Sequence, residues 1–479
     1  MTTSSFARPY SLTAVRVTTR PLLLVLVVTL LGALLISLPN LLDPMIRHDD
    51  YPAFLAQPTG YWEKTLHEGR WLNYFWHFRG VVTPAWLNFA LYQGLWAITA
   101  ACLAVAAMGQ QNGRNLWVTA LLALLILMAP PATMISLWFN TLLPGLAFVA
   151  LYCYLACRLS PFWHRALLLP FTVVTFMSYT TYPLILLAAC ILRSEHRSLR
   201  DLGGLAALFL FSFGSAMLVT YAINWQVYGI FGVPLADWRH ATPANDLGGF
   251  VANLPKLKLT LYWLWVANGY DSAVALMLVP ISLLIASLIL LRKAPMEALY
   301  LHAGLWCGIA LMAAQVLQLG VRVPARSFAF VWIFYAAIIA RAAVLQVQDL
   351  DLKTRIGRWM PLIMVLVYLP LSFQHYLAFR PWLAETRDFA ERVLATSAPI
   401  IVYGDVMQLT TGKLAKLQDP MALPLRMEAL TGRDLVLCGL NPEVCHFLQG
   451  AGRRFGLPKP FVASITGKGD EIRLVYSGA

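Results

Sequence analysis

Charged residues are scarce in this sequence of 479 residues: Asp, Glu, Lys and Arg make up 12%, whereas 59% of the residues are hydrophobic. Soluble globular domains contain about 25% charged and about 45–50% apolar residues. A single core in water cannot hide so much apolar surface, so we expect lipid to surround most of the chain. The composition excludes a cytosolic enzyme, a small secreted disulfide protein and a nucleic-acid-binding protein. It predicts an α-helical polytopic membrane protein.

Cysteine and the common cofactor motifs are also scarce. Of the seven cysteines, only Cys438 and Cys445 lie outside apolar segments. A short-loop disulfide between them is one open possibility if their side of the membrane is oxidising. His446 adds only one further metal ligand, so we predict no metal site. No P-loop, GxGxxG, HExxH or GxSxG motif occurs, which argues against a soluble nucleotide as substrate.

Long charge-free stretches locate the expected membrane spans. The net charge of +13 is spread thinly between them, a pattern typical of topology signals and of contact with anionic membrane lipid. At about 20 residues per crossing, residues 115–157 must hold two helices, which we expect to separate near Trp138–Pro144. The stretches are 21–42, 80–113, 115–157, 166–192, 202–236, 272–291, 298–321, 327–340 and 359–379.

The segment 166–192 decides the topology. As one span it would place Arg158 and Arg165 opposite Arg193, whereas two short helices turning at Thr180–Pro183 would gather all of them on one side. Basic residues favour the cytoplasmic side, so we predict the pair. The result is about eleven transmembrane helices of about 20 residues each, with a cytoplasmic N-terminus.

The composition changes abruptly after residue 379. Residues 1–379 form the expected transmembrane domain, and residues 380–479 carry 12 of the 36 basic and 10 of the 23 acidic residues. A helical stretch at Trp382–Thr396 and β-like runs at Pro399–Tyr403, Leu435–Leu440 and Glu471–Tyr476 predict a small α/β domain. After eleven crossings this domain lies opposite the N-terminus.

Acidic residues concentrate in the first outer loop, residues 43–80. Five of the 13 acidic residues in the first 379 lie there, among them Asp49 and Asp50. Adjacent carboxylates repel each other, so one of the two is expected to have a raised pKa and to accept a proton near neutral pH. A solvated acid or a helix cap is the alternative. Recurrent aromatic residues predict interfacial helices in this loop.

Two arginines, Arg322 and Arg326, lie in a short outer loop at the membrane boundary. The planar guanidinium group suits binding of a lipid phosphate. Anchoring to headgroups is the equally open alternative.

Taken together, these features resemble the glycosyltransferase C superfamily of integral-membrane enzymes. The resemblance rests on the many helices, the large first outer loop and an acidic pair just after the first helix. The sequence HDDY at His48–Tyr51, followed by EGRW at Glu68–Trp71, is most similar to the bacterial serotype-converting O-antigen glucosyltransferases.

The resemblance implies a polyprenyl-phosphate sugar donor and a glycan acceptor, such as O-antigen of lipopolysaccharide, at the periplasmic face of the bacterial inner membrane. Asp49 or Asp50 would deprotonate the acceptor, with inversion at the anomeric carbon. The other expected roles are donor-phosphate binding by Arg322 and Arg326, orientation of the acid or sugar by His48, Tyr51 and Arg70, and packing against the lipid or sugar by Trp62 and Trp71. Some relatives use a divalent metal, which we do not predict here.

Two other classes remain open. A multi-pass transporter or lipid-linked-sugar flippase would explain the many helices and the broken pair around Pro170–Pro183. However, transporters usually carry charges within their spans, and here the polar residues gather on one face. A scaffold protein that binds partners through its C-terminal domain is the remaining alternative.

Overall fold

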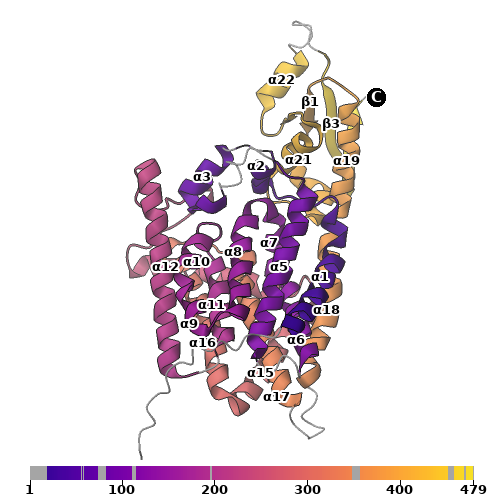
Figure 1. Cartoon of the computed structure of the whole chain (residues 1–479). Helices are drawn as coiled ribbons and strands as arrows, with labels where there is room; N and C mark the ends of the chain where they lie inside the picture. The colour runs from indigo at the N-terminus through magenta and orange to yellow at the C-terminus, as the bar shows by residue number, and fades with distance from the viewer. Residues whose placement is uncertain are drawn as a thin grey trace, which may run out of the picture.

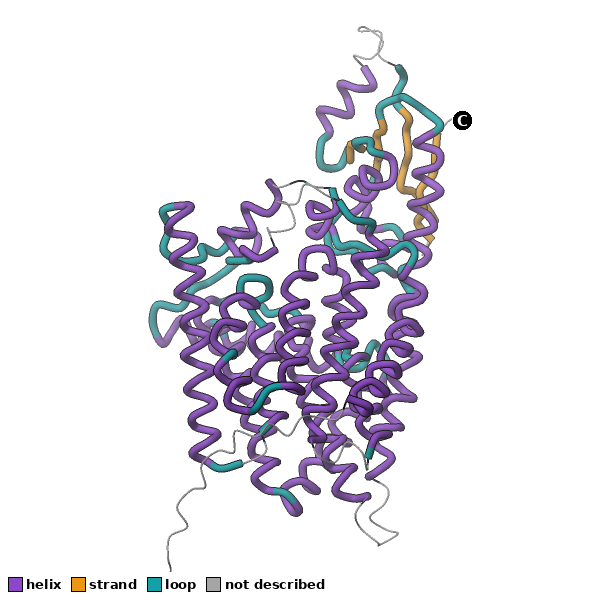
Figure 2. The backbone as a smooth tube through the Cα atoms, in the orientation of Figure 1, coloured by secondary structure: helices purple, strands orange, loops and turns teal. Residues whose placement is uncertain are grey.

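The computed structural model of the chain describes residues 19–55, 57, 59–73, 82–109, 115–194, 197–347, 357–450, 458–468 and 471–477. Its body is a bundle of helices, with a small domain of helices and strands at one end (Figure 1). Figure 2 shows that the strands are confined to that domain within the described chain.

Eight helical segments in the described chain are long and apolar enough to cross a membrane. This finding confirms a helical membrane protein, whereas the number of eleven crossings stays a prediction. The eight segments are Thr19–Leu41 (α1), Ala85–Met108 (α5), Pro130–Arg158 (α7 Pro130–Ile135, η3 Ser136–Trp138 and α8 Phe139–Arg158), Leu199–Tyr228 (α12), Ala273–Lys293 (α15), Pro295–Leu319 (α16), Ala325–Gln346 (η5 Ala325–Phe328 and most of α17 Ala329–Val347) and Gly357–Leu394 (α18 Met360–Leu377 and α19 Arg380–Leu394).

Shorter helices complete the body. The region predicted to hold two short helices contains α10 (Leu168–Phe176) and α11 (Tyr182–Arg193), joined by a five-residue turn. Arg165 binds Ser194 Oγ at 3.0 Å, next to the last residue of α11. Arg165 and Arg193 therefore lie at the same end of the helical body, as expected for a helical hairpin. The remaining short helices of the body are α6 (Leu116–Leu127) and α9 (Pro161–Ala166).

The expected separation near Trp138–Pro144 is wrong by about ten residues. Helix α6 ends at Leu127, and Pro130 and Pro131 occupy the first turn of α7. Proline suits that position because the first turn needs no backbone N–H donor. Pro144 instead lies inside α8. The 3-10 turn η3 directly precedes this helix.

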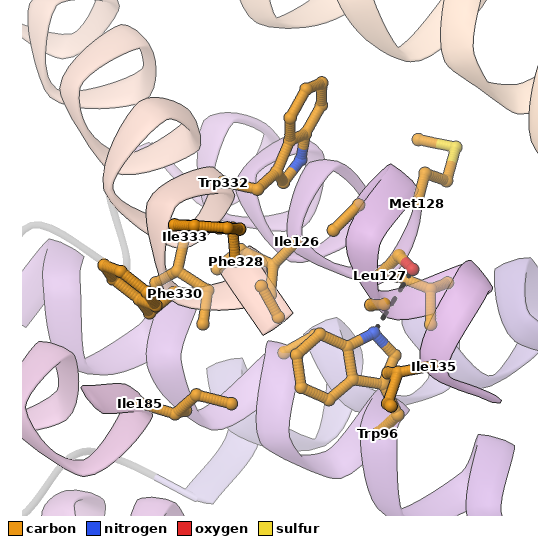
Figure 3. Close-up of a cluster of buried hydrophobic side chains, with 14 of the residues drawn as sticks. Trp96, Ile126, Leu127, Met128, Ile135, Ile185, Phe328, Phe330, Trp332 and Ile333 are labelled. Carbon is orange, nitrogen blue, oxygen red and sulfur yellow. Dashed lines mark hydrogen bonds between the residues drawn. The ribbon is translucent and has the colours of Figure 1, made fainter. Parts of the chain in front are cut away.

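Large aromatic side chains fill the centre of the body, between α5, α6, α7 and α17 (Figure 3). The indole nitrogen of Trp96 donates to the Leu127 carbonyl at 3.2 Å (Figure 3). The indole nitrogen of Trp332 donates to the Leu125 carbonyl at 2.7 Å. Each buried indole N–H is thus satisfied near the end of α6.

Close helix packing also depends on small residues. In α16, Gly304 and Gly308 form a G-x-x-x-G pattern opposite α17, and an added Cβ on either residue would collide with Phe334 or Phe330. Lipid supplies little hydrophobic driving force between helices, so such close approach provides much of the packing energy.

The C-terminal domain is α/β, as predicted. Strands β1 (Ile400–Tyr403) and β2 (Leu435–Leu437) agree with the expected runs, as does β4 (Glu471–Ser477), whereas β3 (Phe461–Lys468) was not anticipated. The sheet order is β2-β1-β3-β4, with only β3 and β4 antiparallel. The helical elements are α19, η7 (Val406–Gln408), α20 (Thr410–Leu414), α21 (Ala422–Thr431) and α22 (Pro442–Gly450).

A disulfide joins Cys438 and Cys445, with their Cα atoms 5.6 Å apart. It ties the end of β2 to α22. Of the two possibilities for this pair, the structure therefore has the bonded one.

The first outer loop lies at the same end as the C-terminal domain (Figure 1). It forms η1 (His48–Asp50), α2 (Tyr51–Phe54) and α3 (Thr59–Glu68), while its expected last part, residues 74–80, lies outside the described residues. The outer loop after α12 contributes η4 (Asp237–Arg239), α13 (Leu247–Ala252) and α14 (Leu254–Ala267).

Candidate functional site

Asp50 is a helix cap. Its side chain is fully buried, and its two oxygens accept the backbone N–H groups of Asn140 at 2.9 Å and Thr141 at 2.8 Å. These groups belong to the first turn of α8, where unpaired N–H donors favour an acidic partner. Burial raises the pKa of Asp50 to about 7, and the bonds from Thr141 and Asn140 limit the rise.

Asp49 has a different environment. Its Oδ1 accepts the indole N–H of Trp138, and its Oδ2 lies 3.5 Å from Lys64 Nζ. About a third of the side chain, 32%, is exposed. Burial alone would raise the pKa of Asp49, but the positive charges of Lys64, His48, Arg326 and Arg70 together hold it well below its ordinary value. Asp49 is therefore an ionised, partly accessible carboxylate.

The pair was expected to contain one carboxylate with a raised pKa because of mutual repulsion. One pKa is raised, but it belongs to Asp50, and its largest cause is burial rather than the neighbouring charge. The helix cap, one of the alternatives for this pair, describes Asp50. Asp49 is the partly exposed carboxylate of the pair.

Trp138 connects Asp49 to two arginines. The guanidinium group of Arg326, from η5, lies 4.1 Å from the centroid of the Trp138 ring, and that of Arg47 lies 5.7 Å from it. Among the described residues Arg326 forms no ion pair, so its planar fork has no carboxylate partner there. An arginine held by its face on an aromatic ring keeps its N–H edge for an anion.

A second acid lies beside this group. Glu68, at the end of α3, is 2.7 Å from Arg70 Nε and 3.0 Å from Arg239 of η4. Arg70 also lies over the ring of Tyr179 at 5.3 Å, and the Tyr179 hydroxyl is 2.9 Å from Ser327 Oγ. Glu68 thus joins the two outer loops and keeps Arg70 near η5.

These contacts define the outer charge cluster, which carries a surplus of positive charge. A buried cation that no anion balances is unfavourable, because burial removes its hydration without a compensating attraction. The cluster consists of five cationic side chains and three carboxylates: Arg47, Lys64, Arg70, Arg239 and Arg326, with Asp49, Asp50 and Glu68. An anionic ligand would offset the difference.

The other predicted site residues lie outside this cluster or at its edge. Trp71 donates to Asn224 Oδ1 at 2.8 Å and packs edge-on against Trp62, so it fastens the outer loop to α12. Arg322 is exposed and forms no hydrogen bond or ion pair with any described residue.

His48 and Tyr51 face the C-terminal domain. His48 Nε2 lies 4.0 Å from Asp419 Oδ2, and the buried Tyr51 hydroxyl lies beside Arg426 of α21. In contrast, Arg326 and Arg70 lie close enough to Asp49 for their charges to lower its pKa, and the roles predicted for these residues stay predictions.

Sequence reasoning missed Trp138, Lys64, Arg239 and Arg47. Lys64 and Arg47 had a local signal, because both are basic residues in the acidic outer loop. Trp138 had none, since 89 residues separate it from Asp49.

The described residues include no group of three or more His, Cys, Asp or Glu side chains placed to hold a metal ion. Independence from metal stays a prediction. A scan against models of known families finds no match, and a search of curated proteins finds no significant match.

Proposed function

We propose that this protein is a membrane glycosyltransferase that moves a sugar from a polyprenyl-phosphate donor to a cell-envelope glycan, with Asp49 as the base. The observation that carries the proposal is an ionised, partly exposed carboxylate beside Arg326, which has no carboxylate partner in the described part of the chain, in a cluster with surplus positive charge. A lipid-linked phosphate is an anion that reaches such a cluster from the membrane.

In the proposed reaction, Asp49 accepts the proton of the acceptor hydroxyl as its oxygen bonds to the anomeric carbon. The bond from that carbon to the phosphate oxygen breaks, and the electron pair leaves with polyprenyl phosphate. Arg326 and Arg70 stabilise the departing negative charge. A single displacement inverts the anomeric carbon.

The low pKa of Asp49 is compatible with this role. Its surrounding cations hold the pKa down while no anion is bound. A donor phosphate would offset the field of Arg326 and Lys64, and the pKa of Asp49 would rise towards that of an effective base. Asp49 would therefore become more basic when the donor binds.

For the location we propose the bacterial inner membrane, with the N-terminus cytoplasmic and the C-terminal domain periplasmic. The disulfide Cys438–Cys445 fits an oxidising compartment. Arg165, Arg193 and Arg341 lie at the opposite end, in agreement with the preference of basic residues for the cytoplasm.

A transporter or flippase gains no specific support. The broken pair α10 and α11 was its main argument, but Leu72 N–H donates to the Met177 carbonyl and Asn73 donates to the Ser178 carbonyl. The break therefore lies against the outer loop, where its backbone groups are satisfied by that loop.

The test uses purified protein in nanodiscs with a panel of polyprenyl-phosphate sugars and O-antigen acceptor, and it measures release of polyprenyl phosphate by mass spectrometry. Asp49→Asn should lower turnover by about 100-fold or more while donor binding persists. Asp271→Asn is the matched control, because Asp271 is an exposed outer carboxylate paired with Lys416.

Turnover by wild type and by Asp271→Asn but not by Asp49→Asn would support the proposal. Normal turnover by Asp49→Asn would remove Asp49 as the base. Failure of wild type to bind any donor would favour the transporter.

A further inference from the structure

The C-terminal domain contacts the outer loop immediately before the acidic pair. Asp43 forms ion pairs with Arg387 of α19 at 2.9 Å and with Arg426 of α21 at 2.8 Å. Four residues later, Arg47 donates to the backbone carbonyls of Ala415 at 3.2 Å and Lys416 at 2.8 Å. The domain thus holds both ends of the short stretch that leads to Asp49.

Contacts continue on the other side of the pair. Gln57 Nε2 donates to Glu428 of α21 at 2.7 Å, and Tyr51 lies beside Arg426. All these domain residues come from α19 to α21, the part of the domain nearest to the outer loop (Figure 1). The segment 43–57, which contains Asp49, is therefore fixed by one face of the C-terminal domain.

Arg47 is the central contact of this face. Its side chain is buried, and its guanidinium group lies between the rings of Trp138, at 5.7 Å, and Phe379, at 6.0 Å. Lys416, one of its two carbonyl partners, has a left-handed backbone with φ of 50°. Such a conformation is unfavourable for a residue with a side chain, and it persists where the surrounding structure determines it.

A continuous set of direct contacts leads from the domain to the carboxylate. The carbonyls of Ala415 and Lys416 hold Arg47, Arg47 lies against Trp138, and the Trp138 indole donates to Asp49. Arg326 packs on the same ring at 4.1 Å. Movement of Arg47 would therefore disturb the support of the Trp138 indole and its hydrogen bond to Asp49, whereas Arg326 keeps its own contact with the ring.

We propose that the C-terminal domain positions the Asp49 carboxylate through Arg47. Arg47 is then a positioning residue, and holding this carboxylate in place is a role of the C-terminal domain. The catalytic meaning of this positioning rests on the proposed transferase function, whereas the positioning itself does not. In the absence of the contact, segment 43–57 would sample other conformations, and Asp49 would lose its fixed orientation towards Trp138.

The first test measures positioning without activity. The full-length Asp49→Cys protein is labelled with a membrane-impermeant maleimide, and the rate of labelling at residue 49 is measured. The parent protein, which keeps Asp49, gives the background labelling of the free cysteines, and this background is subtracted. Adding Arg47→Gln should change the rate by at least about threefold, because the segment is released. Arg392→Gln is the control, since Arg392 lies on α19 but, among the described residues, contacts the exposed Asp388 and the ring of Tyr476 and not the outer loop.

Asp43→Asn provides a second variant if Arg47→Gln does not fold, because it removes two ion pairs to the same domain face. An unchanged labelling rate in the folded variants would overturn the proposal. A changed rate together with absence of turnover in wild type would leave the positioning intact and contradict only the transferase function.

The second test measures donor turnover with Asp49 intact. Arg47→Gln should lower kcat about tenfold with little change in KM for the donor, since the carboxylate is displaced and the phosphate-binding arginine remains. Arg47→Lys should recover part of kcat. A purely structural role would instead lower the amount of folded protein without changing kcat per folded molecule, and that result would also overturn the proposal.

Discussion

The two ends of the helical body contain the same residue types in different arrangements. At the end of the body away from the C-terminal domain, Glu297 contacts Arg341 through both oxygens and lies 3.3 Å from Arg197. Asp201 binds both terminal nitrogens of Arg165 and accepts the Tyr300 hydroxyl at 2.8 Å. Both oxygens of each of these carboxylates have protein partners.

The outer charge cluster is less complete. Asp49 has one hydrogen bond from Trp138 to its carboxylate and a looser contact with Lys64, and Arg326 rests on an aromatic ring. Saturated ion pairs fix helices to each other, whereas unsaturated ones retain capacity for a ligand. The comparison therefore distinguishes charges that hold the fold from charges that are available for chemistry.

Replacing one arginine at each end should separate the two roles most clearly. Arg341→Ala should lower the free energy of unfolding by about 3 kcal/mol, because it removes the bidentate partner of the buried Glu297, although Arg197 remains. Arg326→Ala should leave thermal stability nearly unchanged and lower kcat/KM for the donor by about 100-fold. Thermal melting in detergent and polyprenyl-phosphate release measure the two effects. Loss of stability in Arg326→Ala with unaffected turnover would abolish the distinction.

Asp50 offers a pH test within the outer cluster. Its pKa is raised to about 7 in the folded protein, so between about pH 4 and about pH 7 the folded state binds more protons than the unfolded state. Its contribution to stability is therefore full below about pH 4 and decreases as the pH rises through about 7. The melting temperature should fall from about pH 5 to about pH 8 in wild type and less in Asp50→Asn. An identical pH dependence in both proteins would contradict the assignment.

The disulfide should have the smallest effect on the site. Cys438→Ser should destabilise the C-terminal domain by about 2 kcal/mol, because the short loop gains freedom when unfolded. Turnover should change little, since the disulfide lies near α22 and not among the α19 to α21 contacts with the outer loop. Cys307→Ser is the control, as Cys307 is a free cysteine in α16. A large loss of turnover in Cys438→Ser would show that this part of the domain also acts on the site.

Much of the helical architecture was predictable because apolar stretches of span length are visible in any local window. The hairpin of α10 and α11 followed from the turn at Thr180–Pro183 together with the basic residues that flank the segment on both sides. The end of α6 was placed wrongly because Pro144, near the middle of the charge-free stretch, is a possible helix breaker. The helix instead breaks before Pro130 and Pro131, which begin α7. Strand β3 was not predicted; its sequence FVASITGK is apolar only in its first three residues and then mixes polar residues and a glycine with Ile465.

The candidate site was predictable in part. Asp49, Arg70 and Arg326 were named from the sequence, and the structure brings them together. Their partners were not predictable, because Trp138 is distant in the chain and the contacts of His48 and Tyr51 depend on how the C-terminal domain docks.

The sequence alone showed that lipid surrounds most of this protein. It also showed the approximate positions of most of its helices, its separate C-terminal domain and the acidic loop at one end. These properties depend on local composition, because a membrane span is recognised by the length of its apolar segment and by the charges that flank it. Only the tertiary structure decided that Asp50 caps α8 while Asp49 keeps free surface, and that Arg47 joins the C-terminal domain to Trp138. Those properties depend on contacts between residues far apart in the chain, where burial and hydrogen-bond geometry, not residue type, set the chemistry of each carboxylate.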